Sequence, residues 1–269
     1  PLTAQLTDSR CEHAQLTLQD GRILVVGGQT GHVPRSLAGL ASTELIDPKT
    51  MRVTPGPALH RVMKTATSHL LPDGRAVIVG AGSASVFDPR TDKWQRNIVF
   101  RQSRLEHASA LLDDGRILVA GGTNRMSIEV VDVDEGVSRM MSARLPEPLD
   151  DLSAVALPGS RAWIIGGQSS RTGRTTDRTW IVDVSNPRRS TIKEGPRLGV
   201  AGGVADATVI TVRRWAAVLS GESDMGLSDR ELTDTRLLDT RELTVRSLPA
   251  LPAPHDDAQG AAVGNDLWL

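Results

Sequence analysis

Tyrosine is absent from this sequence of 269 residues, and two phenylalanines and five tryptophans bring its aromatic content to only 3%. The absence of tyrosine excludes mechanisms that use a tyrosine nucleophile or a tyrosine metal ligand. The scarcity of aromatic residues also disfavours lectin-like sugar binding, which uses aromatic rings as stacking platforms. Hydrophobic residues nevertheless make up 39% of the chain, so its length and composition are those of a globular protein with a large core.

Cysteine is almost absent as well, since Cys11 is the only one. One cysteine excludes an internal disulfide framework and the structural zinc sites that need two or four cysteines. The redox compartment therefore stays open. Cys11 lies two residues from His13, so a nucleophile pair on one side of a strand is conceivable, but a small buried hydrophobe is the favoured interpretation of this cysteine.

A strong excess of charge and a long apolar run are also missing. The formal net charge is −1, which argues against a nucleic acid partner because such partners select a basic field. No stretch approaches the roughly 18 apolar residues of a membrane helix, and no secretion signal is visible. Arginine greatly outnumbers lysine, which is typical of a GC-rich bacterial source but does not indicate a compartment. The localisation stays open, with a bacterial secreted or cell-envelope protein slightly favoured over a cytoplasmic one.

The feature that is present is an internal repeat. Its first block places an Asp-Gly turn and an arginine before an apolar strand that ends in a glycine pair. Three copies are well preserved and two are degenerate, at 20–28, 73–82, 114–122, 159–167 and 214–221. Asp-Gly between apolar runs predicts a two-residue hairpin turn, because glycine adopts positive φ at little cost.

A second hairpin follows each glycine pair. Its mark is an apolar run that ends in aspartate, as in 45–50, 86–94, 130–132, 181–183 and 237–240. Two hairpins in every 41 to 54 residues give four strands per repeat, without a helical period between them. The strand before the glycine pair is apolar at successive positions, which suits a sheet that is covered on both faces. We therefore predict an all-β propeller of four-stranded blades.

The glycine pairs, the Asp-Pro-x-Thr turn and a following tryptophan, Trp94, resemble kelch repeats of the bacterial type, in the galactose-oxidase-like propeller group. The resemblance covers the whole chain and implies one kelch propeller domain over 1–269. It does not extend to the copper site of that group, whose tyrosine ligands have no counterpart. The sialidase nucleophile is also tyrosine, so the chain is neither a copper radical oxidase nor a sialidase.

The repeats predict five complete blades and part of another. The approximate bounds are 10–58, 59–103, 104–148, 149–198 and 199–252, with 253–269 and 1–9 forming a mixed last blade. A propeller must join its first and last blades to avoid open strand edges. Six blades are the favoured count and seven the alternative, with closing residues supplied by a longer chain or a complex.

Two sets of loops share one face of such a propeller, namely the loops that enter the first strands and the loops that join the second and third strands. The second set varies most between blades, with a long first loop, an arginine-rich fourth loop and an acidic fifth loop. The candidate partner-binding residues are His32, Arg35, Arg171, Arg174, Arg178, Glu222, Asp224 and Asp229. Arginine grips carboxylates through its planar fork, so mixed basic and acidic sectors favour a polar protein or peptide partner.

For several of these residues a structural role, or simple exposure to solvent, is the favoured interpretation. Arg10 with His13 and Arg104 with His107 recur at equal spacing, which favours hydrogen bonding inside the repeat. A cation site from His255, Asp256, Asp257, Asp150 and Asp151 has suitable ligand types, but acidic loop residues are mostly just solvated. We therefore expect no metal and no cofactor, and we name no catalytic residue.

A non-catalytic protein-binding scaffold is the favoured function. The alternative is an epimerase, lyase or hydrolase with a polar site of arginine, histidine and acidic residues at the central channel. Fold alone does not choose between them, because one fold carries many functions.

Overall fold

The computed structural model describes residues 5–30, 38–224, 229–255, 260–263 and 266–268. The chain divides into two compact units, Pro1–Leu105 with Val131–Ser138, and Glu106–Val130 with Arg139–Leu269. We call them unit 1 and unit 2 and describe each by itself. His32, Arg35, Asp256 and Asp257 lie outside the described residues.

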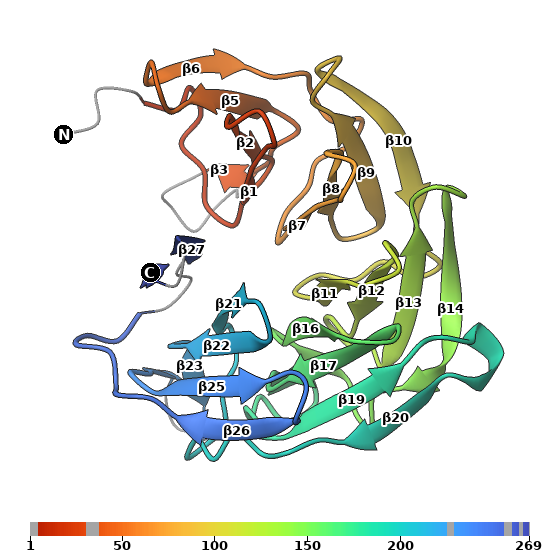
Figure 1. Cartoon of the computed structure of the whole chain (residues 1–269), viewed down its shortest axis with the longest axis vertical. Helices are drawn as coiled ribbons and strands as arrows, with labels where there is room; N and C mark the ends of the chain where they lie inside the picture. Colours follow the sequence, from red (N-terminus) through yellow and green to blue (C-terminus); the bar gives the residue numbers. More distant parts are fainter. Residues whose placement is uncertain (1–4, 31–37, 225–228, 256–259, 264–265, 269) are drawn as a thin grey trace. The chain divides into compact units, whose positions relative to one another are not determined.

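Unit 1 contains two four-stranded antiparallel sheets, the first two blades of a β-propeller (Figure 1). The first blade consists of β1 (Ala14–Thr17), β2 (Ile23–Val26), β5 (Thr43–Asp47) and β6 (Arg52–Pro55). The second blade consists of β7 (Thr67–Leu70), β8 (Ala76–Val79), β9 (Ser83–Asp88) and β10 (Lys93–Val99). A short ladder of β3 (Gln29–Thr30) and β4 (Ala38–Gly39) extends from the first blade.

Unit 2 contains the fourth and fifth blades and most of the third. The third blade consists of β11 (Ala108–Leu111), β12 (Ile117–Ala120), β13 (Ser127–Asp132) and β14 (Val137–Arg144). The fourth consists of β16 (Ser153–Leu157), β17 (Arg161–Ile165), β19 (Thr179–Asp183) and β20 (Thr191–Glu194). The fifth consists of β21 (Thr208–Val212), β22 (Trp215–Leu219), β25 (Thr235–Asp239) and β26 (Thr244–Ser247).

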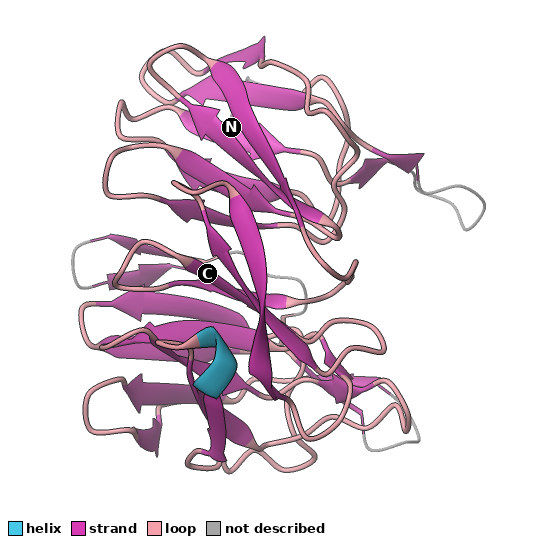
Figure 2. Ribbon diagram, turned by 90° about the vertical axis from the view of Figure 1, so that its right-hand side faces the viewer, coloured by secondary structure: helices cyan, strands magenta, loops and turns pink. Residues whose placement is uncertain are grey.

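Three small ladders and one short helix complete unit 2. The ladders are β15 (Leu149–Asp150) with β18 (Gln168–Ser169), β23 (Glu222–Asp224) with β24 (Asp229–Glu231), and β27 (Ala261–Val263) with β28 (Asp266–Trp268). The 3₁₀ helix η1 (Pro187–Arg189) is the one helix among the described residues (Figure 2). It is far too short to cross a membrane, and no described segment forms a longer helix that could do so.

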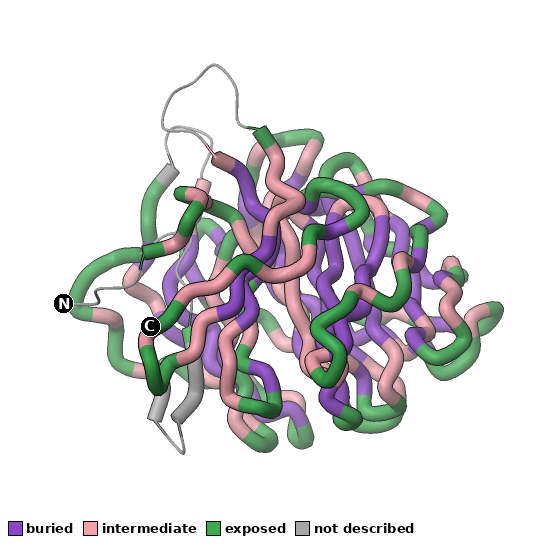
Figure 3. Tube along the Cα trace, turned by 90° about the horizontal axis from the view of Figure 1, so that it is seen from above, coloured by how far each residue is buried: buried purple, intermediate pink, exposed green. Residues whose placement is uncertain are grey.

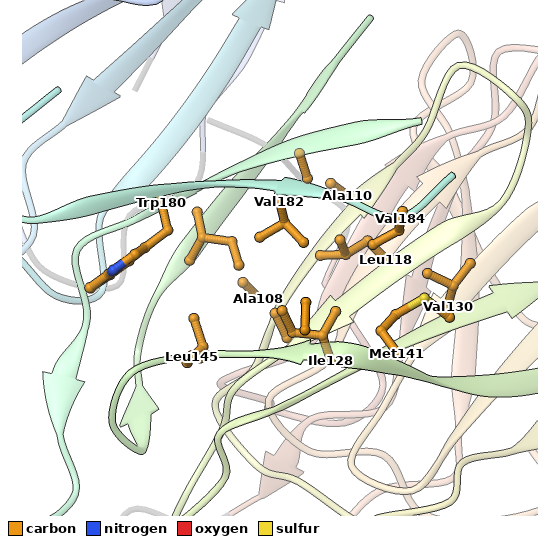
Figure 4. Packing of buried hydrophobic residues seen from close by; sticks show 14 of the residues in the cluster. Ala108, Ala110, Leu118, Ile128, Val130, Met141, Leu145, Trp180, Val182 and Val184 are labelled. Carbon is orange, nitrogen blue, oxygen red and sulfur yellow. The ribbon is translucent and has the colours of Figure 1, made fainter. Parts of the chain in front are cut away.

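The inner strands of the blades are apolar because they are buried. Every residue of β8 and β12 is buried, whereas the hairpin turns at the strand ends are mostly exposed (Figure 3). Figure 4 shows the largest cluster of unit 2, in which Leu118, Ile128 and Met141 of the third blade face Trp180 and Val182 of the fourth. The continuous apolar runs in the sequence thus correspond to strands between two packed layers.

The glycine pairs are the places where one blade contacts the next. In unit 2, the N–H of Gly167 donates a 2.8 Å hydrogen bond to the carbonyl of Val204. Gly166 has a φ of +59°, and a Cβ at this position would collide with the same carbonyl oxygen. The pairs at Gly27 in unit 1 and at Gly121 in unit 2 approach Met63 and Leu149 in the same way. Close approach of the backbones therefore explains why glycine recurs here.

The predicted two-residue Asp-Gly turns are in fact three-residue loops. In the first, Leu18 donates to the carbonyl of Arg22, and Gly21 takes a φ of +88° between them. Loops of this length favour glycine in the left-handed conformation at their end. The fifth blade differs, because Val212 pairs directly with Trp215 across Arg213 and Arg214.

The predicted blade count is wrong, since the structure shows five blades and not six or seven. Residues 261–263 and 266–268 form a two-stranded ladder, as the sequence predicts, and the described residues 5–9 form no strand. The N–H groups of Thr7 and Asp8 instead donate to the carboxylate of Glu44, at 2.8 and 3.5 Å. Hydrogen bonds to the first blade therefore hold the described part of this segment.

Candidate binding face at the strand-one entries

The same backbone conformation recurs just before the first strand of each blade. Five residues at this position have a φ of +45° to +55°, the left-handed region that non-glycine residues rarely adopt. They are Glu12, Thr65, Glu106, Asp151 and Asp206. Each lies two residues before its strand, and four of the five are acidic. The sequence carries a signal for this feature, an acidic residue at a constant offset, but our sequence analysis missed it.

In unit 2 these entry residues are joined through their backbones. The N–H of Asp151 donates to the carbonyl of Glu106 at 3.0 Å, and the N–H of Asp206 donates to the carbonyl of Asp151 at 2.9 Å. The acidic entry residues of three consecutive blades are thus joined one to the next by backbone hydrogen bonds. Glu106 and Asp151 are half-buried, whereas Asp206 is exposed. We call Glu106, Asp150, Asp151, Asp206 and Glu222 the acidic cluster.

Burial and like charge act together on Asp151. Burial raises the pKa of its carboxyl to about 8, with further contributions from the charges of Asp206, Glu106, Asp150 and Glu222. A carboxyl with this pKa is mostly protonated at neutral pH. Asp151 therefore lies half-buried among like charges that disfavour its ionised form.

In Asp150, only one of the two carboxylate oxygens has a hydrogen-bond partner among the described groups. Only 7% of the residue is exposed, and its Oδ2 accepts a 2.8 Å hydrogen bond from the hydroxyl of Ser170. Its Oδ1 is buried and has no hydrogen-bond partner among the described groups. Because a buried unpaired oxygen costs free energy, a donor from a ligand would stabilise this carboxylate.

The predicted arginines of the fourth loop differ from one another. Arg171 and Arg174 are exposed. Arg178 instead contacts Glu194, with Nε 3.2 Å from its carboxylate, and lies 5.6 Å from the ring centroid of Trp180. The structure thus leaves Arg171 and Arg174 accessible, whereas the guanidinium of Arg178 is used within its own blade.

The fourth and fifth loops lie side by side in unit 2. The N–H of Thr175 donates to the carbonyl of Asp224 at 3.3 Å, and the N–H of Asp224 donates to the hydroxyl of Thr175 at 3.0 Å. The predicted acidic residues Glu222 and Asp224 lie on β23, and Asp229 begins β24. The basic and acidic loops are therefore neighbours, and Glu222 also belongs to the acidic cluster.

Arg10 has the internal structural role that the repeat favours. Its guanidinium, which is buried, donates to the carbonyl of Gly27 at 2.7 Å and to Glu44 at 2.7 Å. Burial, followed by the charge of Arg10, lowers the pKa of His13. Arg104 and His107 are buried as well. Cys11 is exposed, and its backbone pairs with that of Gln29.

The structure gives no support for the cation site within the described residues. No group of three or more His, Cys, Asp or Glu side chains there has an arrangement that could hold a metal ion. His255 instead uses its backbone carbonyl, which accepts hydrogen bonds from Gly221 and Ser220.

Comparison with known proteins identifies the fold but not the function. No protein-family model and no curated protein matches the sequence. Among solved structures, one described as "Structure of YjhT" is similar over 99% of this chain and 91% of that chain, with a TM-score of 0.70 and 12% sequence identity. Together with the five four-stranded sheets, this similarity shows that the chain is a β-propeller.

Proposed function

We propose that this protein is a kelch-type propeller that acts as a non-catalytic binding scaffold for a protein or peptide. The binding surface is the face formed by the strand-one entries and the loops between second and third strands. Within unit 2, a basic side chain of the partner would be bound by the acidic cluster. The resemblance of the repeats to kelch sequences supports the first part of this proposal, and the electrostatics of the cluster support the second.

The observation that carries the proposal is the raised pKa of Asp151, about 8, among four other acidic residues. A lysine or arginine side chain would place a positive charge beside Asp151, which would favour its ionised form, and would form charge-assisted hydrogen bonds. The buried Oδ1 of Asp150 offers an acceptor for such a donor.

The neighbouring loop contributes the opposite charge. Arg171 and Arg174 are exposed, and their loop is joined to β23 through Thr175 and Asp224. A partner segment with basic and acidic residues would meet complementary charge in both sectors. Such complementarity favours specificity and fast association.

The test is binding of a fluorescein-labelled peptide of eight lysines to the chain, measured by fluorescence anisotropy. We expect Asp151→Asn with Asp206→Asn to weaken binding about tenfold or more, because two carboxyl groups that could pair with the peptide's cations are lost. The matched control is Asp183→Asn with Glu242→Gln, which removes two carboxyl groups from other parts of unit 2. Equal weakening by both double variants would show that net charge alone acts and would overturn the proposed site.

One observation favours the enzyme as a second candidate. A half-buried carboxyl with a pKa of about 8 can donate a proton at neutral pH, as a general acid does. In an epimerase, lyase or hydrolase at this face, Asp151 would be the acid. Asp151→Asn would then abolish turnover while substrate binding persists, whereas a scaffold has no turnover to lose.

A further inference from the structure

A groove of about 750 Å³ lies in unit 2, at the opposite end of the strands from the acidic cluster. Its walls come from the hairpin turns of the third, fourth and fifth blades. The residues that the argument uses are Asp113, Leu157, Arg213, Arg214, Trp215 and Arg241. This volume is in the range of pockets that bind small organic molecules.

Arg213 occupies an unusual position in this groove. It is the first residue of the two-residue turn between Val212 and Trp215, and its φ is +55°. Glycine is favoured at such a position, and glycine is present in the corresponding turn of the other four blades. An arginine here costs backbone energy, and such residues are often found where a side chain has a function.

The charged side chains that line the groove differ in whether they already have a partner. Arg214 is paired, with its Nη2 3.3 Å from the Oδ2 of Asp239. Asp113 is also used, since it accepts hydrogen bonds from the N–H groups of Gly159 and Ser160 at 2.7 and 3.0 Å. These backbone N–H groups lower the pKa of Asp113 and keep it ionised.

The guanidinium groups of Arg213 and Arg241 are not paired in this way, although the charge of Arg241 contributes to lowering the pKa of Asp239. Both are exposed residues that line the groove, and neither guanidinium forms a hydrogen bond or ion pair with any described residue. Their positive charge is therefore available to a ligand.

The remaining walls combine aromatic and apolar surface. Trp215 is half-buried, with the guanidinium groups of Arg214 and Arg246 at 4.6 and 4.8 Å from its ring centroid. These cation–π contacts hold the indole ring in place. Leu157 and the neighbouring Ala156 and Pro158 provide an apolar wall in the same groove.

We propose that this groove binds a small organic anion. Its carboxylate or phosphate group would be held by Arg213 and Arg241, whose planar forks suit either oxyanion. Its apolar body would lie against Leu157 and Trp215. The site is separate from the acidic cluster and has the opposite charge preference, so the two proposals stand or fall independently.

The test is isothermal titration calorimetry with two probes that share an apolar ring, phenyl phosphate and phthalate. We expect at least one probe to bind, and the preferred probe identifies the oxyanion. Arg213→Gly with Arg241→Ala should weaken that binding about tenfold or more. The matched control, Arg188→Ala with Arg189→Ala, removes two exposed arginines of η1 in the same unit and should leave binding unchanged.

The single variant Arg213→Gly serves as the control for correct folding. Because glycine relieves the positive φ, this variant should melt at the same or a higher temperature than the wild-type protein while it binds the probe more weakly. The proposal is overturned if neither probe binds in the millimolar range or if the control weakens binding as much as the test variant. Binding of an octaglutamate peptide without either small anion would also overturn it and would indicate an acidic protein partner.

Discussion

The N–H of Asp206 donates a 2.9 Å hydrogen bond to the carbonyl of Asp151, so two acidic residues in the left-handed conformation lie on adjacent blades of unit 2. The bond aligns the entries of the fourth and fifth blades. It also explains why the charge of Asp206 is the largest charge contribution to the raised pKa of Asp151. The backbone hydrogen bond thus brings the two carboxyl groups close together, and their like charge contributes to the raised pKa of Asp151.

Asp151→Asn should stabilise the protein at alkaline pH. The carboxyl has a pKa of about 8 in the fold and about 3.9 when unfolded, so the native state binds more protons between these values. Stability of the wild-type protein therefore has a component that falls as pH rises from about 4 to about 8. Asparagine tolerates positive φ and removes the titration. Urea unfolding at pH 5 and pH 8.5 should show a larger gain for the variant at pH 8.5.

Asp183 provides a control, because its pKa is shifted in the opposite direction from that of Asp151. Hydrogen bonds from the hydroxyl and N–H of Ser185 lower the pKa of Asp183, so its contribution is present above the unfolded pKa and is lost as pH falls. Asp183→Asn should therefore destabilise the protein at pH 8.5. An equal response of both variants to pH would contradict the assignment of the raised pKa to Asp151.

Binding of a basic peptide should release protons. A cation beside Asp151 favours its charged form and lowers its pKa from about 8, so the carboxyl ionises at pH 7 when the complex forms. Calorimetry of octalysine binding in buffers of different ionisation enthalpy measures this release. It should decrease at pH 9, where the carboxyl is already ionised, and should be absent in Asp151→Asn.

Gly166→Ala should destabilise the fourth blade strongly. The positive φ costs an alanine about 1–2 kcal/mol, and its Cβ would collide with the carbonyl of Val204, for a total of about 2–5 kcal/mol. Gly159→Ala is the matched control, because Gly159 also has a positive φ but has open space around it. Urea unfolding should show only about 1–2 kcal/mol for the control. Similar losses for both would show that blade contact does not require the first glycine.

Removal of Arg10 should leave Glu44 buried without its main partner. The two side chains are 0% and 3% exposed, and their charged atoms are 2.7 Å apart. Arg10→Met should cost about 3–5 kcal/mol of stability, since the uncompensated carboxylate stays buried. The double variant with Glu44→Leu should lose less, because it removes both charges. A double-mutant cycle by urea unfolding measures the difference, and additive losses would contradict this coupling.

Arg178 and the pair Arg171 with Arg174 should respond differently to alanine. Arg178 contacts Glu194 and Trp180, so its loss should cost about 0.5–1 kcal/mol of stability. Arg171→Ala with Arg174→Ala should change stability by less than about 0.5 kcal/mol, because both side chains are exposed. Urea unfolding compares them. A large loss in the double variant would show that these arginines support the loop and are not available to a partner.

Repetition is what made the fold readable from the sequence. Glycine pairs mark the end of the second strand in the first, third and fourth blades, because glycine permits the close approach seen at Gly166. The unbroken apolar runs before these pairs identify strands that are covered on both faces, such as β8 and β12. These signals are local and recur at a constant place, so they predict a propeller of four-stranded blades without any knowledge of long-range contacts.

The blade count and the site depended on contacts between distant residues. The N-terminal segment is held by Glu44, 37 residues away from Thr7, a contact that no local pattern in the sequence predicts. Glu106, Asp151 and Asp206 are separated by whole blades in the sequence, and only the backbone bonds between adjacent blades bring them together. The sequence by itself thus determined the repeating unit, since that depends on local turn and strand chemistry. Only the tertiary structure decided the number of blades and which charges face one another, because both depend on how the units of the repeat are stacked.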